Sequence, residues 1–298
     1  MFQDDPRSYD SRDRADQWRD ERERGTRNAN ESAAEHDPHD VFARYVDLPR
    51  GLERELVRDR DREYSLNGSD ARTLSIVGAF RVVPERDLLD RGDPFDVRER
   101  DLRHLEREGL IQRLPFDGRD HVVALTDGGR ELLERHRNAD SGARQVFYSG
   151  ADRARERTHD AQLYRAYLTE AERLREREAR VVRVKLDREL KREYQQFLHD
   201  RNRDDPNTDG RPDRTRQEVE AWAREHDLPY FDEQVHFPDV RIEYVDVDGD
   251  IRHRDIEVTT EHYRGGHSAA AHRSGFSIHT AGRSGGASPD PHLAEEFL

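Results

Sequence analysis

The sequence contains no cysteine, and its single methionine is the first residue. The absence of thiols excludes disulfides, thiolate zinc sites, iron–sulfur clusters and cysteine nucleophiles. No apolar run reaches the roughly 18 residues that a membrane-spanning helix needs. The N-terminus also lacks the basic-then-apolar order of a secretory signal. These absences predict a soluble, cytoplasmic protein that has no membrane partner.

Apolar residues are scarce as well. They make up 32% of the 298 residues, against roughly 45–50% in an average globular protein, while charged residues reach 40%. The 66 acidic and 52 basic residues give a net charge of −14. The protein as a whole is therefore repelled by nucleic acid and by anionic membranes, so any nucleic-acid contact must be local. Because Lys185 and Lys191 are the only lysines, the sequence is rich in arginine throughout, and arginine content alone indicates no function.

Composition divides the chain into four segments. Residues 1–65 are rich in Arg, Asp, Glu and Ser and poor in apolar residues, and they are predicted to form a disordered tail, although the apolar cluster at 41–48 leaves a docking element or a transient helix open. Segments 66–140 and 141–264 carry periodic apolar patterns and are predicted to fold. In 265–298 Gly, Ser, Ala and His dominate, which predicts a flexible tail.

The segment 66–140 reads as three short helices, a β-hairpin and a closing helix, because helix-start residues, glycine stops and short apolar strands follow one another in that order. The expected elements are a helix beginning at Ser69-Asp70, a second beginning at Pro84, a third from about Asp96 to Glu108, strands Ile111–Leu114 and His121–Leu125, and a helix after Thr126-Asp127-Gly128-Gly129.

This order resembles a winged helix-turn-helix. The sequence RERDLRHLEREGLI (98–111) is similar to a recognition helix, and HVVALTDGGRELLERHR (121–137) is similar to the second wing strand and the helix that follows it. The resemblance implies that the third helix docks in the major groove of duplex DNA, where arginine can bind guanine or phosphate.

Helical periodicity supports a basic face on the third helix. At about 100° per residue, Leu102 and Leu105 lie on one side and most basic residues collect on the other. The candidate DNA-binding residues are Arg98, Arg100, Arg103, His104 and Arg107 on the helix, with Arg113 and Arg119 on the wing. The same pattern also suits a solvated helix with internal ion pairs, because acidic residues flank the basic ones.

The segment 141–264 is predicted to be a small α/β domain, because amphipathic helices alternate in it with short β-branched strands. The expected elements are a helix from Asp160 to Arg180, a strand at 181–186, helices around Leu190–Leu198 and Glu218–Glu225, and strands 240–245 and 254–259 joined by a turn at Asp248-Gly249.

Pro238-Asp239 before one strand and Glu257 in the next resemble the core of restriction-endonuclease-like nucleases. That resemblance implies that Asp239 and Glu257 hold a catalytic Mg²⁺, with the carbonyl of Val258 as a third ligand. The lysine expected two residues after the glutamate is replaced by Thr259. We therefore expect either no cofactor and no strong catalysis, or a degraded Mg²⁺ site in which an arginine such as Arg241 or Arg264 substitutes. Acidic residues on an ordinary hairpin are the alternative.

The two segments together, over about 69–264, resemble the replication-relaxation family of mobile-element proteins. In that family a winged helix precedes a histidine-bearing helix, here Thr158-His159-Asp160, and a hairpin of the Pro238-Asp239 and Asp255-Ile256-Glu257 type. The resemblance implies a DNA-binding accessory or regulatory protein in plasmid or transposon replication or mobilisation. A Mg²⁺-dependent nuclease and a non-catalytic adaptor that dimerises through the winged helix are the alternatives.

Two other patterns carry less weight. His262, His267 and His272 are five residues apart, which places them on no common helical face, so we interpret them as tail histidines. The segment 246–250 is similar to the start of a calcium loop, but the required glycine position holds Ile251. Neither pattern predicts a metal site.

Overall fold

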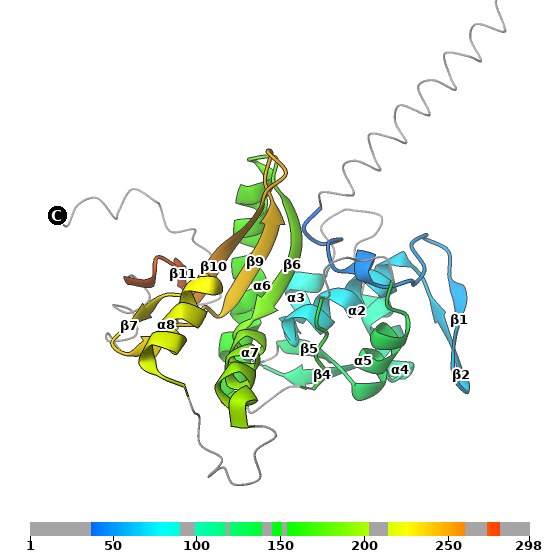
Figure 1. Ribbon diagram of the computed structural model, residues 1–298. Helices are drawn as coiled ribbons and strands as arrows, with labels where there is room; N and C mark the ends of the chain where they lie inside the picture. The colour runs from blue at the N-terminus through cyan, green and yellow to red at the C-terminus, as the bar shows by residue number, and fades with distance from the viewer. Residues whose placement is uncertain are drawn as a thin grey trace, which may run out of the picture.

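The computed structural model describes residues 37–89, 99–116, 118, 120–138, 145–150, 154–202, 214–259 and 273–280. These residues form a mixed α and β structure with several small sheets (Figure 1). The prediction of a mixed α and β protein is confirmed at this level.

The first half of the chain contains a two-stranded hairpin, short helices and a three-stranded antiparallel sheet. The order of strands in that sheet is β3-β5-β4. The elements are η1 (Ala43–Tyr45), β1 (Glu55–Asp59), β2 (Arg62–Leu66), α2 (Gly68–Phe80), β3 (Val82–Pro84), α3 (Glu85–Leu88), α4 (Glu99–Arg107), β4 (Ile111–Pro115), β5 (His121–Leu125) and α5 (Asp127–Arg135).

Local sequence signals set several of these boundaries. Helix α2 begins with a capping box, because the Asn67 side chain accepts the Asp70 amide at 3.0 Å and the Asp70 carboxylate accepts the Asn67 amide at 3.1 Å. The cap is therefore Asn67, slightly before the predicted start at Ser69-Asp70. Gly109 follows α4 with a φ of +73°, a conformation that favours glycine. Thr126 caps α5 by accepting the amide of Gly129, so the helix begins at Asp127 and includes Gly128 and Gly129, which were predicted to precede it.

The second half is built on a four-stranded sheet with the order β11-β10-β9-β6. Its strand pairs are antiparallel except for the parallel pair β10–β11. The elements are α6 (Ala154–Arg175), β6 (Arg180–Leu186), α7 (Asp187–His199), η2 (Asp200–Asn202), α8 (Arg216–Glu225), β7 (Tyr230–Phe231), β8 (Gln234–Val235), β9 (Val240–Val245), β10 (Ile251–Thr259) and β11 (Ser277–Thr280).

The long helix α6 joins the two halves. It packs against β3 of the first half and against β6, β9 and β10 of the second. Its start at Ala154 precedes the predicted start at Asp160, and it ends at Arg175 rather than Arg180. The additional residues at the beginning place His159 inside a regular helix.

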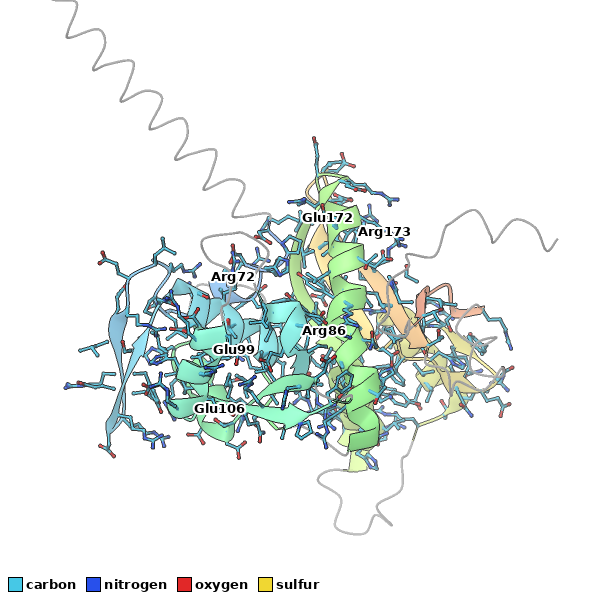
Figure 2. All side chains as sticks on the ribbon, turned by 180° about the vertical axis from the view of Figure 1, so that it is seen from behind. Arg72, Arg86, Glu99, Glu106, Glu172 and Arg173 are labelled. Atoms are coloured by element: carbon cyan, nitrogen blue, oxygen red, sulfur yellow. The ribbon has the colours of Figure 1, made fainter. Side chains whose placement is uncertain are left out.

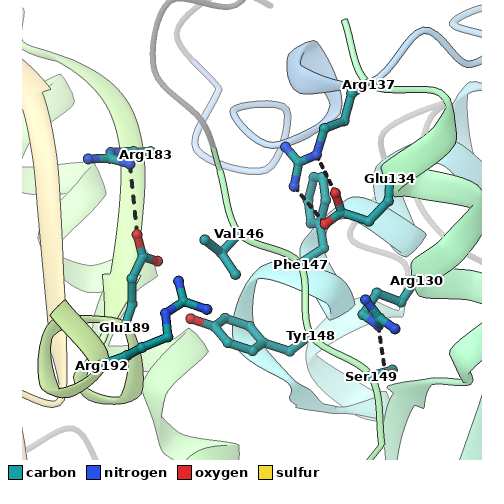
Figure 3. Close-up of a pocket in the computed structure, with 10 residues that line it drawn as sticks. All are labelled: Arg130, Glu134, Arg137, Val146, Phe147, Tyr148, Ser149, Arg183, Glu189 and Arg192. Carbon is teal, nitrogen blue, oxygen red and sulfur yellow. Dashed lines mark hydrogen bonds and ion pairs between the residues drawn. The ribbon is translucent and has the colours of Figure 1, made fainter. Parts of the chain in front are cut away.

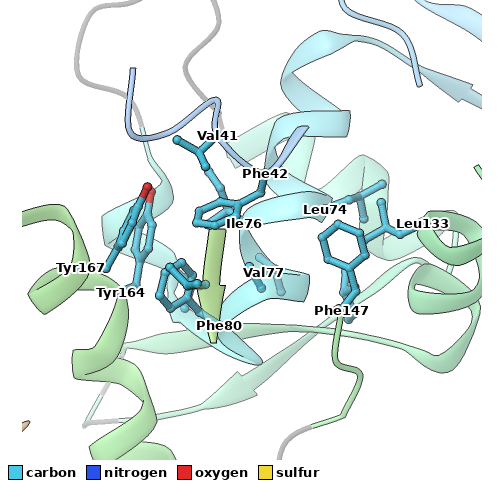
Figure 4. Packing of buried hydrophobic residues seen from close by; sticks show 14 of the residues in the cluster. Val41, Phe42, Leu74, Ile76, Val77, Phe80, Leu133, Phe147, Tyr164 and Tyr167 are labelled. Atoms are coloured by element: carbon cyan, nitrogen blue, oxygen red, sulfur yellow. The ribbon is translucent and has the colours of Figure 1, made fainter. Parts of the chain in front are cut away.

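Four aromatic side chains form the centre of the shared core (Figure 4). We call Phe42, Phe80, Tyr164 and Tyr167 the aromatic cluster. Phe80 contacts Tyr164 and Tyr167 of α6 with ring centroids 5.2 and 5.1 Å apart, and Phe42 lies 5.4 Å from Phe80. All four side chains are fully buried. One buried apolar cluster thus continues from the first half of the chain into the second.

The expectation of disordered tails is wrong for the parts that the structure describes. Residues 37–66 fold, with Phe42 in the core and a hairpin whose Val57, Tyr64 and Leu66 are buried between exposed charged residues. Average composition hides such an alternating pattern, in which every second side chain faces the interior. Similarly, β11 lies within the predicted flexible tail and pairs with β10. Residues 1–36 and 281–298 lie outside the described residues.

Candidate functional site

Helix α4 has an apolar face toward the core and a basic face toward solvent. Leu102 and Leu105 are fully buried beneath it. The side chains of Arg100 and Arg103 are 75% and 66% exposed, and Arg107 is also exposed. Since these three arginines fall within about 60° of one another around the helix axis, they form one strip, which we call the basic ridge.

The guanidinium groups of the basic ridge are only loosely paired. Arg103 donates to Glu99 at 3.0 Å one turn earlier, and Arg100 lies 3.8 Å from Asp101. Arg107 donates to the carbonyl of Arg103 and forms no ion pair with any residue that the structure describes. Figure 2 labels Glu99 and Glu106, two acidic residues of the same helix. Exposed pairs of this kind contribute little stability, so a phosphate can replace the carboxylate at low cost.

Two of the predicted DNA-binding residues are not on the basic ridge. The Nε2 atom of His104 forms a hydrogen bond with the carbonyl of Ser65 at 2.8 Å, and the His104 side chain is mostly buried. Arg113 of β4 donates to Glu85 at 3.0 Å and also lies 3.3 Å from Glu99, which leaves it 19% exposed. Arg98 and Arg119 lie outside the described residues. The structure therefore brings together three of the seven candidates.

The β1–β2 hairpin beside α4 adds basic residues that sequence reasoning missed. Arg58 and Arg62 are exposed on it, and Arg58 pairs with Glu63 at 3.0 Å. Arg54 anchors the base of the hairpin, because it donates to Asp70 at 2.7 Å and contacts Asp101 on α4. The alternation of Val57, Tyr64 and Leu66 was the available signal for this hairpin.

The second predicted site lies where β9 begins. The strand register pairs Val240 with Ile256, which sets Asp239 and Glu257 beside each other on adjacent strands, as predicted. The Asp239 carboxylate accepts the amide of Val258 at 2.8 Å. The backbone carbonyl of Asp239 accepts the amide of Asp187 at 3.1 Å. Asp239 therefore connects the start of β9 with the ends of its two neighbouring strands, β6 and β10.

His159 of α6 reaches the same carboxylate. Its Nε2 donates to Asp239 at 3.0 Å, and its Nδ1 lies 3.4 Å from Asp160. Burial by itself lowers the pKa of His159, but the carboxylates of Asp160 and Asp239 outweigh burial and raise its pKa to about 10. Asp160 also accepts a hydrogen bond from Arg81 at 2.8 Å. A chain of charges, Arg81–Asp160–His159–Asp239, thus links the end of α2 to the large sheet.

The Asp239 carboxylate already has partners at the position predicted to hold Mg²⁺. Among the described residues, no three His, Asp or Glu side chains gather closely enough to hold a metal ion. One carboxylate oxygen of Asp239 already accepts two hydrogen bonds, one of them from a charged imidazole. The hydroxyl of Thr259 turns toward β11, and Arg241 is held by Asp255 at 2.7 Å. Arg264, the other proposed substitute for lysine, lies outside the described residues.

No family model, no curated protein and no solved structure matches the chain. Among the helices that the structure describes, none combines the length and the apolar content needed to cross a bilayer.

Proposed function

We propose that the protein binds duplex DNA by placing the basic ridge of α4 in the major groove. The observation that carries the proposal is that Arg100, Arg103 and Arg107 project to solvent from one side of a helix whose other side is buried. Arginine in this position can bind guanine edges or phosphates. The net charge of −14 restricts attraction to this local strip.

The arrangement around α4 supports the proposal. The order α2-β3-α3-α4-β4-β5, with a β3-β5-β4 sheet, corresponds to a winged helix-turn-helix in which α4 is the recognition helix and β4–β5 the wing. On this reading Arg113 supports the wing through Glu85 instead of contacting DNA. The neighbouring hairpin adds two further exposed arginines, Arg58 and Arg62.

For the second half we propose a nuclease-like fold without strong catalysis. The helix α6 followed by a sheet of β6, β9, β10 and β11, with Asp239 and Glu257 on adjacent strands, supports the nuclease-like assignment, although α7, η2, α8, β7 and β8 lie between β6 and β9 in the chain. The contact between His159 and Asp239 agrees with the replication-relaxation resemblance, which places a histidine-bearing helix before the hairpin. We therefore propose an accessory or regulatory protein of a mobile element, acting in the cytoplasm.

Band-shift titration of the full-length protein on duplex DNA at low salt tests the main proposal. The variant Arg100→Glu/Arg103→Glu/Arg107→Glu should lose binding. Removing three phosphate contacts should also lower the slope of log affinity against log salt by about 2 to 3. The control Arg175→Glu/Arg216→Glu/Arg224→Glu changes the net charge equally at exposed positions of other helices and should bind nearly as the wild type does. Equal losses in both triple variants would falsify the assignment of the ridge.

A metal-dependent nuclease is the second candidate, since Asp239 and Glu257 are neighbours. Supercoiled plasmid is incubated with the full-length protein and Mg²⁺ or Mn²⁺. We expect intact plasmid. Cleavage that disappears in Asp239→Asn and persists in the control Asp246→Asn would instead establish the nuclease. A salt-insensitive protein complex without DNA binding would favour the adaptor.

A further inference from the structure

A pocket of about 780 Å³ lies between α5, the segment 145–150 and α7. Figure 3 shows Arg130 on one side, Arg192 and Glu189 on the other, and Tyr148 between them. A volume of this order is typical of small-molecule sites.

Four arginines line the pocket, and two of them are already neutralised. Arg137 pairs with Glu134 at 2.7 Å, and Arg183 pairs with Glu243 at 2.6 Å. Arg130 donates to the hydroxyl of Ser149 at 3.2 Å but, like Arg192, it forms no ion pair with any residue that the structure describes. Within the described residues the pocket therefore carries two guanidinium groups without a carboxylate partner. Their positive charge is suited to binding an anion.

Two buried polar atoms in the same pocket lack hydrogen-bond partners within the described part of the chain. They are the hydroxyl of Tyr148 and Oε2 of Glu189. A buried polar atom without a partner costs free energy that a bound ligand can recover. The tyrosine hydroxyl can donate to a phosphate oxygen, while the carboxylate oxygen can accept from a hydroxyl or an amino group. Val146 and the ring of Tyr148 add an apolar wall.

We propose that this pocket binds a nucleoside monophosphate. The two unpaired arginines balance the double charge of a phosphate monoester, Glu189 accepts a hydrogen bond from the sugar or base, and the apolar wall contacts the base. A bare phosphate would leave the Glu189 oxygen and the apolar wall unused. A nucleoside alone would leave both guanidinium groups unpaired.

Isothermal titration calorimetry with the full-length protein, in the absence of DNA, tests the proposal. The probes are AMP, GMP, CMP and UMP, with inorganic phosphate and adenosine for comparison. We expect at least one monophosphate to bind about tenfold or more tightly than either comparison compound, because each comparison compound lacks one set of contacts. Absence of binding by all four monophosphates, or equal binding of inorganic phosphate, overturns the proposal.

Three variants locate the binding. Arg192→Gln should weaken it by about ten- to a hundredfold, since it removes a charge-assisted hydrogen bond, whereas the neighbouring Lys191→Gln should leave it unchanged. Arg192 is exposed, so its replacement should not impair folding. Tyr148→Phe should weaken ligand binding while leaving the unliganded protein as stable as the wild type, because the hydroxyl has no partner to lose. Undiminished binding in Arg192→Gln also overturns the assignment.

Discussion

The basic ridge and the His159–Asp239 site both contain charged side chains, but these side chains differ in burial and in how firmly they are paired. On α4 the arginines are exposed and their pairs are single contacts to flexible carboxylates. At the start of β9 the charges are largely buried and each one is held from two sides. The comparison shows that burial decides whether a charge is available to a partner or fixed within the fold.

The largest effect on stability is expected from breaking the buried chain of charges. Arg81→Met leaves Asp160, whose side chain is only 12% exposed, without its guanidinium partner. Such a change should lower the free energy of unfolding by about 3–5 kcal/mol. Urea unfolding measures it. The double variant Arg81→Met/Asp160→Asn should recover part of the loss, and a single variant as stable as the wild type would show that the pair is not buried in solution.

Substitutions on the two faces of α4 should differ almost as much in their effect on the free energy of unfolding. Leu105→Ala removes a fully buried side chain and should cost about 2–5 kcal/mol. Arg107→Ala on the opposite face should change the free energy of unfolding by less than about 0.5 kcal/mol. Both values come from the same urea titration. Comparable losses in the two variants would mean that the ridge is covered and therefore not open to DNA.

The contribution of the His159–Asp239 site to the free energy of unfolding should depend on pH. His159 has a pKa raised from 6.5 to about 10, so its charged form stabilises the folded state fully below pH 6.5 and loses this effect as pH rises through 10. The stability difference between the wild type and His159→Gln should therefore shrink between these two values. Chemical unfolding at pH 6.5 and pH 10 checks this. A difference that grows with pH would contradict the proposed ion pairs.

The smallest effect is expected at the exposed pair Glu99–Arg103. A double-mutant cycle with Glu99→Gln and Arg103→Gln should give a coupling energy of about 0.3–0.5 kcal/mol. The matching cycle with His159→Gln and Asp239→Asn should give a larger value, since that pair is more buried. Equal coupling energies would remove the contrast between the two regions.

Elements defined by neighbouring residues were predictable from the sequence, and contacts between distant segments were not. Gly109 and Thr126 mark the ends of α4 and the start of α5, and the buried leucines of α4 follow from helical spacing. Periodicity also gave the basic ridge. Helical periodicity also placed His104 with the arginines, because the spacing of residues within α4 carries no information about the β1–β2 hairpin, whose Ser65 carbonyl contacts the His104 ring.

The second site shows the same division. The sequence indicated that Asp239 and Glu257 belong to adjacent strands, because a short turn connects them. The contact between Asp239 and His159 joins residues 80 positions apart, and neither the sequence pattern nor the family resemblance predicted it. Strand β11 pairs in parallel with β10 although its composition resembles a linker, so tertiary pairing overrides the local signal there.

The aromatic cluster has a consequence for how this chain could be divided or exchanged. A fragment cut near residue 140 would leave Phe42 and Phe80 uncovered, because Tyr164 and Tyr167 belong to α6. A chimeric protein that carries the α4 region would therefore have to include α6 as well. Because they share this core, the two halves of the described structure are best regarded as one folding unit and not as two interchangeable modules.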